Sequence, residues 1–158
     1  MAAANSGWNL GFLTILHEPT GYLGGYLVTN QWGRPLEFRL STAVQPNRVQ
    51  QILYGPTLEA YLCGDLIAKT LIDKTGTPTE LIITDHPAAM DVRVRVDKPV
   101  GLLKGPHGIE THPEFPRDDE RIHDLIAQVG GGLSLAEPFT RIREAIGEAR
   151  KLGVTGRG

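Results

Sequence analysis

An aspartate and a histidine follow directly after a short apolar run of the chain. Leu81-Ile82-Ile83-Thr84 predicts a strand buried on both faces, and Asp85-His86-Pro87 ends it. Ionisable side chains at the carboxyl ends of buried strands are where α/β proteins place many of their sites. An aspartate near a proline is also a common turn residue, because its carboxylate bonds nearby backbone N–H groups. Asp85 is therefore a candidate for chemistry or for a turn cap, and the sequence supports both interpretations.

Two further histidines, His107 and His112, flank Glu110 in the segment GPHGIETHPEF. Imidazole and carboxylate groups together suit Zn²⁺ or another transition metal. A His-x₄-His spacing among prolines and glycines is not the helical HExxH pattern, so exposed loop histidines are the alternative interpretation. Cys63 is the only cysteine, which excludes an intramolecular disulfide and a CxxC zinc motif. Its apolar neighbours predict a small core residue.

A third candidate is an aromatic residue and a cation at a predicted turn. Trp32 and Arg34 stand in QWGRP, between two strand-like segments. Trp and Arg are the residues most often found at the centre of interfaces, and an exposed ring can also stack on a base. Arg93 and Arg95, on the polar side of DVRVRV, would extend a basic strip toward the same partner. The alternatives are a tryptophan folded over the sheet edge and edge charges that prevent aggregation.

Composition limits the classes of protein that these residues can belong to. The 158 residues are 41% hydrophobic and 22% charged, which predicts one globular domain spanning 1–158 with flexible tails at 1–8 and 153–158. A formal net charge of −2 argues against a protein that coats nucleic acid, although a local basic patch stays open. No signal-peptide pattern, no 20-residue apolar run and no GxSxG or phosphate-loop motif is present. We therefore expect a cytoplasmic protein without a membrane partner.

The first 40 residues predict an antiparallel meander. Residues 12–16 form a short apolar strand, and residues 24–30 and 36–40 read as two strands joined by the Gly-Pro turn of QWGRP. In the return strand the apolar side chains alternate with Glu37 and Arg39. That alternation predicts one buried face, formed by Leu36, Phe38 and Leu40.

Helical periodicity follows, with a break in the middle. A helix begins near Pro46, and Val49, Ile52 and Leu53 form an apolar stripe at helical spacing. Gly55-Pro56 must break or sharply kink it, and the pattern then resumes as far as Gly76, so that two packed helices and one long kinked helix fit equally well.

After the buried strand at 81–84, the alternation of residues 91–96 predicts a half-exposed strand. Residues 98–116, rich in Pro, Gly and His, predict a long loop. Asp118 or Asp119 would cap a helix that ends at Gly130. A last helix begins at about Ala136 and packs through Phe139, Ile142, Ile146 and Leu152.

These elements predict an α/β fold with a mixed sheet: a three-stranded antiparallel meander, a helical crossover, a buried central strand and C-terminal helices. This order resembles the ribonuclease H-like fold. The residues that carry the resemblance are GGYLVTNQWGRPLEFRL for strands two and three, NRVQQIL for the start of the helix and LIITD for the central strand. It covers roughly residues 11–85, about half of the chain.

The resemblance implies a set of metal-binding carboxylates. Enzymes of that superfamily use Mg²⁺ ions, held by acids, to cleave phosphodiesters by in-line displacement. Asp85 matches the acid that ends the fourth strand. The family's first strand usually carries an Asp, whereas residues 12–16 have none and the nearest acid is Glu18. Glu59 corresponds to the helical acid. The last acid would be Asp118, Asp119 or Asp124.

Two functional hypotheses follow. The first is a non-catalytic α/β module that binds a protein or nucleic-acid partner through Trp32, Arg34, Arg93 and Arg95. The alternative is a nuclease, or a related phosphoryl-transfer enzyme, that uses Mg²⁺ or Mn²⁺ held by Asp85 and Glu18. Shared metal ligation needs those two acids within about 4–5 Å of each other. They emerge at the same sheet edge only if the first strand lies beside residues 81–84 and parallel to them.

Overall fold

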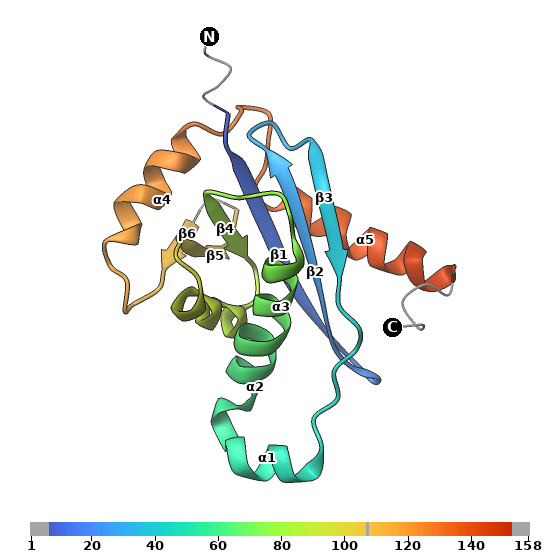
Figure 1. Cartoon of the computed structure of the whole chain (residues 1–158). Coiled ribbons are helices and arrows are strands. Elements are labelled where there is room, and N and C mark those ends of the chain that lie inside the picture. Colours follow the sequence, from blue (N-terminus) through green and yellow to red (C-terminus); the bar gives the residue numbers. More distant parts are fainter. Residues whose placement is uncertain (1–6, 107, 153–158) are drawn as a thin grey trace.

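The computed structural model describes residues 7–106 and 108–152, which form a mixed six-stranded sheet with helices on both faces (Figure 1). The sheet order is β3-β2-β1-β4-β5-β6. The strands are β1 (Asn9–Glu18), β2 (Gly21–Asn30), β3 (Pro35–Leu40), β4 (Leu81–Thr84), β5 (Val100–Lys104) and β6 (Gly108–Thr111). Strands β1, β2 and β3 pair antiparallel, which confirms the predicted meander. Strand β4 lies parallel to β1 and to β5, and β6 is antiparallel to β5.

The crossover between β3 and β4 is a chain of short helices. It consists of α1 (Arg48–Tyr54), the 3₁₀ turn η2 (Gly55–Thr57), α2 (Leu58–Ala60), the π-helix η3 (Tyr61–Ala68) and α3 (Lys69–Lys74). The predicted break is confirmed: Gly55 has a φ of +51° and Pro56 follows it, so α1 cannot continue through this point. Helices α2, η3 and α3 of the crossover and the 3₁₀ helix η4 (Pro87–Arg95) cover one face of the sheet, here called the η3 face.

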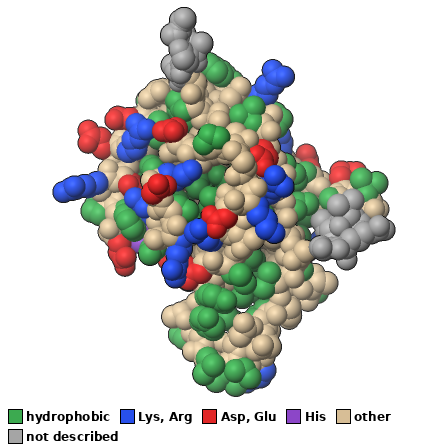
Figure 2. Space-filling view, in the orientation of Figure 1, with side chains coloured by type: hydrophobic (Ala, Val, Ile, Leu, Met, Phe, Trp, Pro, Cys, Tyr) green, Lys and Arg blue, Asp and Glu red, His purple; other side chains and the backbone are tan. Residues whose placement is uncertain are grey.

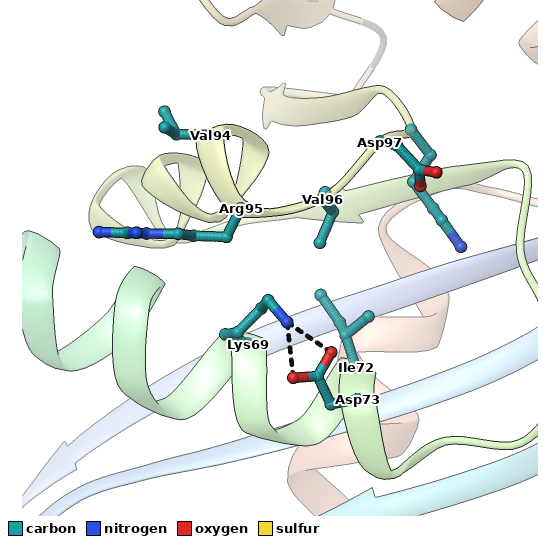
Figure 3. A pocket seen from close by; sticks show the side chains of 8 residues that line it. Lys69, Ile72, Asp73, Val94, Arg95, Val96 and Asp97 are labelled. Carbon is teal, nitrogen blue, oxygen red and sulfur yellow. Dashed lines mark hydrogen bonds and ion pairs between the residues drawn. The ribbon is translucent and has the colours of Figure 1, made fainter.

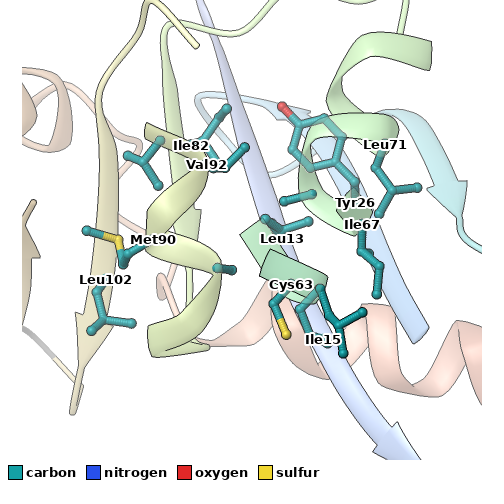
Figure 4. Close-up of a cluster of buried hydrophobic side chains, with 14 of the residues drawn as sticks. Leu13, Ile15, Tyr26, Cys63, Ile67, Leu71, Ile82, Met90, Val92 and Leu102 are labelled. Carbon is teal, nitrogen blue, oxygen red and sulfur yellow. The ribbon is translucent and has the colours of Figure 1, made fainter. Parts of the chain in front are cut away.

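Helices α4 (Asp118–Ala127) and α5 (Glu137–Lys151) cover the opposite face, called the α5 face. Successive residues of β1 alternate between the two faces. Leu13 lies in the η3-face cluster (Figure 4), and Phe12 lies in the α5-face cluster. Strand β4 is buried on both faces, as its continuous apolar run predicts. Cys63 lies in the η3-face cluster with no exposed surface, and burial raises the pKa of its thiol to about 12, so it is a core residue as expected.

A carboxylate on β3 holds the segment that enters β4. Glu37 accepts hydrogen bonds from the Thr77 hydroxyl (2.7 Å) and the Thr77 backbone N–H (2.9 Å). It also pairs with Arg39 at 2.8 Å. The Thr77 hydroxyl, together with these other donors, lowers the pKa of Glu37 to about 2. The ionised carboxylate therefore ties the edge strand to the centre of the sheet.

Residues 91–96 do not form the predicted strand. They end η4 instead, and they pack against η3 rather than pairing with β4. Gly64 permits this approach, because a Cβ there would lie 2.8 Å from the Cβ of Asp91. Val92 is fully buried whereas Val94 is 54% exposed. The alternating pattern correctly identified Val92 as a buried residue. The segment itself, however, is helical and not extended.

The predicted loop at residues 98–116 was also wrong, since it contains β5 and β6. Val100 and Leu102 are buried on the η3 face, and β5 occupies the sheet position beside β4. Gly101 lets Ile109 cross at close range: a Cβ on Gly101 would lie 2.7 Å from its methyl Cγ2. Short strands rich in glycine carry little period-two signal, which is why the pattern hid this hairpin.

The apolar side of β3 is not the dry face that alternation predicts. Leu36 is 45% exposed and Phe38 is 37% exposed. Strand β3 is an edge strand, and α5 packs over β1 and β2 instead. Only Leu40 reaches the α5-face cluster. The alternation identified the apolar side of β3, but it could not show whether another element packs against that side.

Two predicted features of the C-terminal helices need correction. Helix α4 starts after Arg117 without a side-chain cap, and Asp118 and Asp119 lie in its first turn. Helix α5 packs through Phe139, Ile142 and Ile146 as predicted, whereas Leu152 is 75% exposed.

The tails predicted at 1–8 and 153–158 lie outside the described residues except for Gly7 and Trp8. The Trp8 indole donates to the Gln128 side chain at 3.0 Å. No helix among the described residues is long and apolar enough to cross a membrane.

Candidate partner-binding surfaces

Asp85 and Glu18, the acids at the ends of two strands, emerge at the same edge of the sheet but at different positions along the strand direction. Strand β1 runs parallel to β4, and Leu13 pairs with Thr84. The register therefore brings Asp85 level with Thr14, a buried neutral residue. Glu18 stands four residues further along β1, about 13 Å away at the rise of a strand. Of the two strand directions that the sequence left open, the structure has the parallel one, but the extra length of β1 separates the two carboxylates.

Each of these acids has an arginine partner on α5. Arg143 forms an ion pair with Asp85, and Arg150 donates to Glu18 at 2.7 Å. The two arginines are seven residues apart, two turns of helix, so they match the separation of the acids. Two carboxylate oxygens at this edge, Oδ1 of Asp85 and Oε1 of Glu18, are buried without a hydrogen-bond partner among the described residues, and Oε1 of Glu18 lies in an ion pair with Arg150. The negative charge at this edge is thus neutralised by the chain itself.

The other candidate acids lie elsewhere. Glu59 is exposed on α2, on the η3 face, where it helps to raise the pKa of Tyr22 after burial itself. Asp119 accepts from the Thr111 hydroxyl at 2.8 Å. Asp124 is exposed on α4. Within residues 7–106 and 108–152, no group of three or more His, Cys, Asp or Glu side chains could hold a metal ion.

The histidines singled out in the sequence accept hydrogen bonds from nearby backbone N–H groups. His86 Nδ1 accepts from the Ala88 N–H at 3.3 Å and starts η4. His112 is buried, and its Nδ1 accepts from the Glu114 N–H at 3.1 Å. His107 lies outside the described residues. These contacts give both described rings a structural role.

Arg93 and Arg95 do not form an open basic strip. The Arg93 side chain is only 13% exposed, donates to Asp118 at 2.7 Å and lies 3.8 Å over the Phe115 ring. Arg95 pairs with Asp65 at 3.3 Å. Because these residues belong to a 3₁₀ helix and not to a strand, their side chains do not share one polar face.

Arg95 borders a polar pocket of about 410 Å³ between α3 and the segment after η4 (Figure 3). Lys69 and Lys98 are its other cations, and Asp73 and Asp97 its acids. Lys69 bonds both oxygens of Asp73, at 2.6 and 2.7 Å. Lys69 and Asp73 therefore neutralise each other, and Arg95 is neutralised by Asp65, which lies outside the lining.

The β2–β3 turn carries an exposed tryptophan, which is one of the two arrangements that the sequence left open. Asn30 accepts from the backbone N–H groups of Trp32 (2.9 Å) and Arg34 (3.0 Å), and Gly33 takes a φ of +88°. Trp32 is 69% exposed. Its ring lies against Gly130, where a Cβ would come within 2.3 Å of the ring. The turn and the α4–α5 connection thus form one surface, and Arg34 is exposed beside it.

Beside Trp32 lies an apolar hollow of about 340 Å³, which we call the α4–α5 hollow. None of the described residues that line it is charged. They are Pro106, Ile126, Val129, Gly130, Gly131, Leu133, Ser134 and Leu135.

Helix α1 forms where the helical spacing predicts it, yet none of its seven residues is buried. Val49 and Ile52 are each 63% exposed and Leu53 is 77% exposed. The helix stands at one end of the molecule (Figure 1), and hydrophobic side chains gather on that lobe (Figure 2). We call this exposed helix the α1 arm.

The α1 arm is a formed helix and not a frayed segment. Asn47 caps it by accepting from the Gln50 N–H at 2.8 Å, and the Gln50 side chain accepts from the Asn47 N–H at 3.0 Å. At its other end the Tyr54 ring stacks on Tyr61 with centroids 4.4 Å apart. The arm therefore presents its stripe in a fixed direction.

Sequence reasoning missed the arm as a surface because periodicity does not reveal what covers a stripe. One signal was available: between Leu40 and Glu59 the only charged residue is Arg48. A segment so poor in charge, interrupted by Gly-Pro, is unusual for a solvated helix.

No protein-family model, curated protein or solved structure matches this chain.

Proposed function

We propose that this chain is a non-catalytic α/β module that binds a protein partner through the α1 arm. The observation that carries the proposal is the exposure of Val49, Ile52 and Leu53 on a well-capped helix. Three apolar side chains at i, i+3 and i+4 are the pattern by which a helix enters a hydrophobic groove of another protein. Full burial of such side chains stabilises a complex by roughly 1.5–3 kcal/mol each before the costs of association.

A protein partner fits the arm better than nucleic acid. Phosphate binding needs clustered Lys and Arg, and Arg48 is the only charged residue of α1. Arg93 and Arg95, the cations expected to extend a basic strip, are paired with Asp118 and Asp65. Apolar contact, in contrast, is the main driving force of association between proteins.

The proposal has two further parts: the chain has a ribonuclease H-like outline, and it does not catalyse a reaction. A meander of β1, β2 and β3, followed by a helical crossover to β4 beside β1, supports that outline. At the height of Asp85, where that superfamily carries an acid on the first strand, this chain has Thr14. The last helix supplies Arg143, a cation, instead of an acid. Both features support a binding role over phosphodiester cleavage.

Affinity capture from extract of the source cells tests the binding role. We expect the wild type to retain a specific protein and Leu53→Glu to lose it, because the charge cannot enter an apolar groove. Gln50→Glu is the matched control: it adds the same charge on the same helix, and a glutamate preserves the capping box. Equal capture by Leu53→Glu and the wild type, or capture of nucleic acid alone, would contradict the proposal.

The alternative function, a divalent-metal nuclease, is favoured by one observation. Oδ1 of Asp85 is buried without a partner, and a bound cation would supply one. In that case millimolar Mg²⁺ or Mn²⁺ would stabilise the wild type, by about 2.7 kcal/mol at a hundredfold excess over Kd. Asp85→Asn would abolish this gain.

We expect the opposite result for Asp85→Asn. The substitution removes the charged partner of Arg143, so the free energy of unfolding falls by about 1–2 kcal/mol. Mg²⁺ leaves the thermal midpoint of both proteins unchanged. Asp73→Asn is the control, since its pair with Lys69 is more exposed and contributes little. Thermal unfolding with and without metal makes the comparison, and a midpoint that Mg²⁺ raises only in the wild type would show a metal site at Asp85 and make the nuclease interpretation the leading one.

A further inference from the structure

Strand β3 is an edge strand whose outer side meets no other strand among the described residues (Figure 1). The Ser41 N–H donates to the Gly24 carbonyl at 2.9 Å, so the backbone of Ser41 faces β2. Because backbone groups alternate in direction along a strand, the N–H and C=O of Phe38 and Leu40 point away from the sheet. The edge of β3 therefore offers donors and acceptors to a further strand.

We propose that β3 of one copy pairs antiparallel with β3 of a second copy, about a two-fold axis between the two Phe38 residues, so that two chains share one continuous sheet. Each Phe38 N–H then donates to the Phe38 carbonyl of the other copy, which the outward direction of these groups allows. The same surface is used on both copies, so the assembly closes at two chains. The pairing uses no residue of the α1 arm and does not depend on the proposed function.

The charges of β3 select a second copy of the same strand as the occupant of this edge. Residues 36–40 read Leu-Glu-Phe-Arg-Leu, which places Glu37 and Arg39 symmetrically about Phe38. Within one chain these two side chains meet on the same face of the sheet at 2.8 Å. In the two-fold pairing, Glu37 of each copy also lies opposite Arg39 of the other. Opposite charges in facing positions stabilise a sheet, so the strand is complementary to itself.

Other pairings of this edge lack that complementarity. The outward backbone groups recur at every second residue, so one strand can slide along the other only in steps of two residues. A slide in one direction places the two Arg39 side chains opposite each other, and a slide in the other direction does the same for Glu37. Like charges in facing positions destabilise a sheet. Strand β6, the opposite edge of the sheet, has Glu110 as its only charged residue and would give Glu37 no cation.

The pairing also covers the apolar side of β3. Leu36 is 45% exposed and Phe38 is 37% exposed, because α5 packs over β1 and β2 instead. In the two-fold register the two Phe38 side chains face each other, and Leu36 faces Leu40 of the other copy. Aromatic and aliphatic pairs in facing positions add to the stability of a sheet.

The contact is short, and this sets its strength. Pro35 and the bulge after Val28 end the regular edge, which confines the pairing to about five residues. So short a contact buries less than the roughly 800 Å² per partner of a standard interface. We therefore expect a weak dimer, with Kd on the order of tens of micromolar, whose register is fixed by its backbone groups and charges.

Sedimentation velocity over a range of concentrations tests the dimer. Arg39→Glu places acid opposite acid at both symmetric positions, and we expect it to stay at the mass of one chain. Arg39→Lys keeps the positive charge and should dimerise. Arg117→Glu is the matched control, because it makes the same change of charge at an exposed residue that precedes α4 and lies outside β3. The wild type, Arg39→Lys and the control should reach the mass of two chains and no more.

Disulfide trapping tests the register with variants that leave both charges in place. Residues that exchange both hydrogen bonds across antiparallel strands have Cα atoms about 5.5 Å apart, within the range of a disulfide. Phe38→Cys should therefore cross-link two chains under mild oxidation. Leu36→Cys is the control, since Leu36 is similarly exposed but its two copies lie about 13 Å apart in this register. Cys63 is buried and does not compete.

A wild type that is monomeric throughout would overturn the inference and assign the β3 edge to a strand of another protein. Dimerisation of Arg39→Glu equal to that of the wild type would overturn it as well. So would growth beyond two chains, or cross-linking of Leu36→Cys as rapid as that of Phe38→Cys.

Leu53→Glu separates this dimer from the proposed function. It should dimerise like the wild type, because α1 takes no part in the pairing. A monomeric wild type whose capture of a protein is lost in Leu53→Glu contradicts the dimer alone. A dimeric wild type whose capture is unchanged in Leu53→Glu contradicts the binding role alone.

Discussion

Phe139→Ala is expected to lower the free energy of unfolding by about 3–5 kcal/mol. Phe139 is 2% exposed and meets Phe12 edge to face, with ring centroids 5.6 Å apart. Its removal leaves a cavity between α5 and β1 that the surrounding side chains fill only in part. Because α5 carries Arg143 and Arg150, the loss also loosens the cations that neutralise Asp85 and Glu18. Urea unfolding monitored by circular dichroism measures the change.

Phe38→Ala is the matched control for this substitution. Phe38 is 37% exposed on the uncovered edge strand, so it loses less buried area and leaves no closed cavity. We expect a loss below about 1 kcal/mol. Similar losses for the two phenylalanines would mean that α5 does not pack on β1 as described.

Gly11→Ala is expected to cost about 1–3 kcal/mol or more, because it overpacks the η3 face. A Cβ at Gly11 would lie 2.2 Å from the hydroxyl oxygen of Tyr26 and 2.6 Å from its ring. The ring cannot move aside easily, because Tyr26 is 1% exposed and its hydroxyl lies 3.3 Å from the Thr79 hydroxyl. The same burial raises the pKa of Tyr26 to about 12. Chemical denaturation of the variant and the wild type measures the effect.

Two comparisons identify the cause of that loss. Gly131→Ala introduces the same methyl group where nothing lies within 4 Å, and we expect it to be near neutral. Adding Tyr26→Phe to Gly11→Ala removes the closest atom, so the double variant should lose less than the sum of the single variants. Full additivity would place the effect of Gly11→Ala outside its contact with Tyr26.

The sequence predicted those parts of the fold that depend on local patterns. The meander followed from alternation and a Gly-Pro turn, and the doubly buried strand from the uninterrupted Leu81–Thr84 run. The break at Gly55-Pro56 and the packing of α5 through Phe139 and Ile142 were also correct. Each of these signals is contained within a few residues, where side-chain period and backbone restrictions act directly.

Local patterns gave wrong secondary-structure predictions where one pattern is compatible with two conformations. Residues 91–96 alternate like a strand, yet contact with η3 at Gly64 favours a 3₁₀ helix. Strands β5 and β6 lie in a segment whose glycines and prolines predicted a loop. In both cases a partner distant in the sequence selected the conformation.

By itself, the sequence determined which side of the meander strands, of α1 and of α5 is apolar, and which residues carry charge. Only the tertiary structure decided what each side meets. The register between β1 and β4 set Thr14 beside Asp85, and α5 brought Arg143 and Arg150 to the two acids. The same folding left the stripe of α1 and the apolar side of β3 uncovered. The physical reason is that a hydrophobic period fixes a direction within one element, whereas burial depends on whether another element occupies the space in that direction.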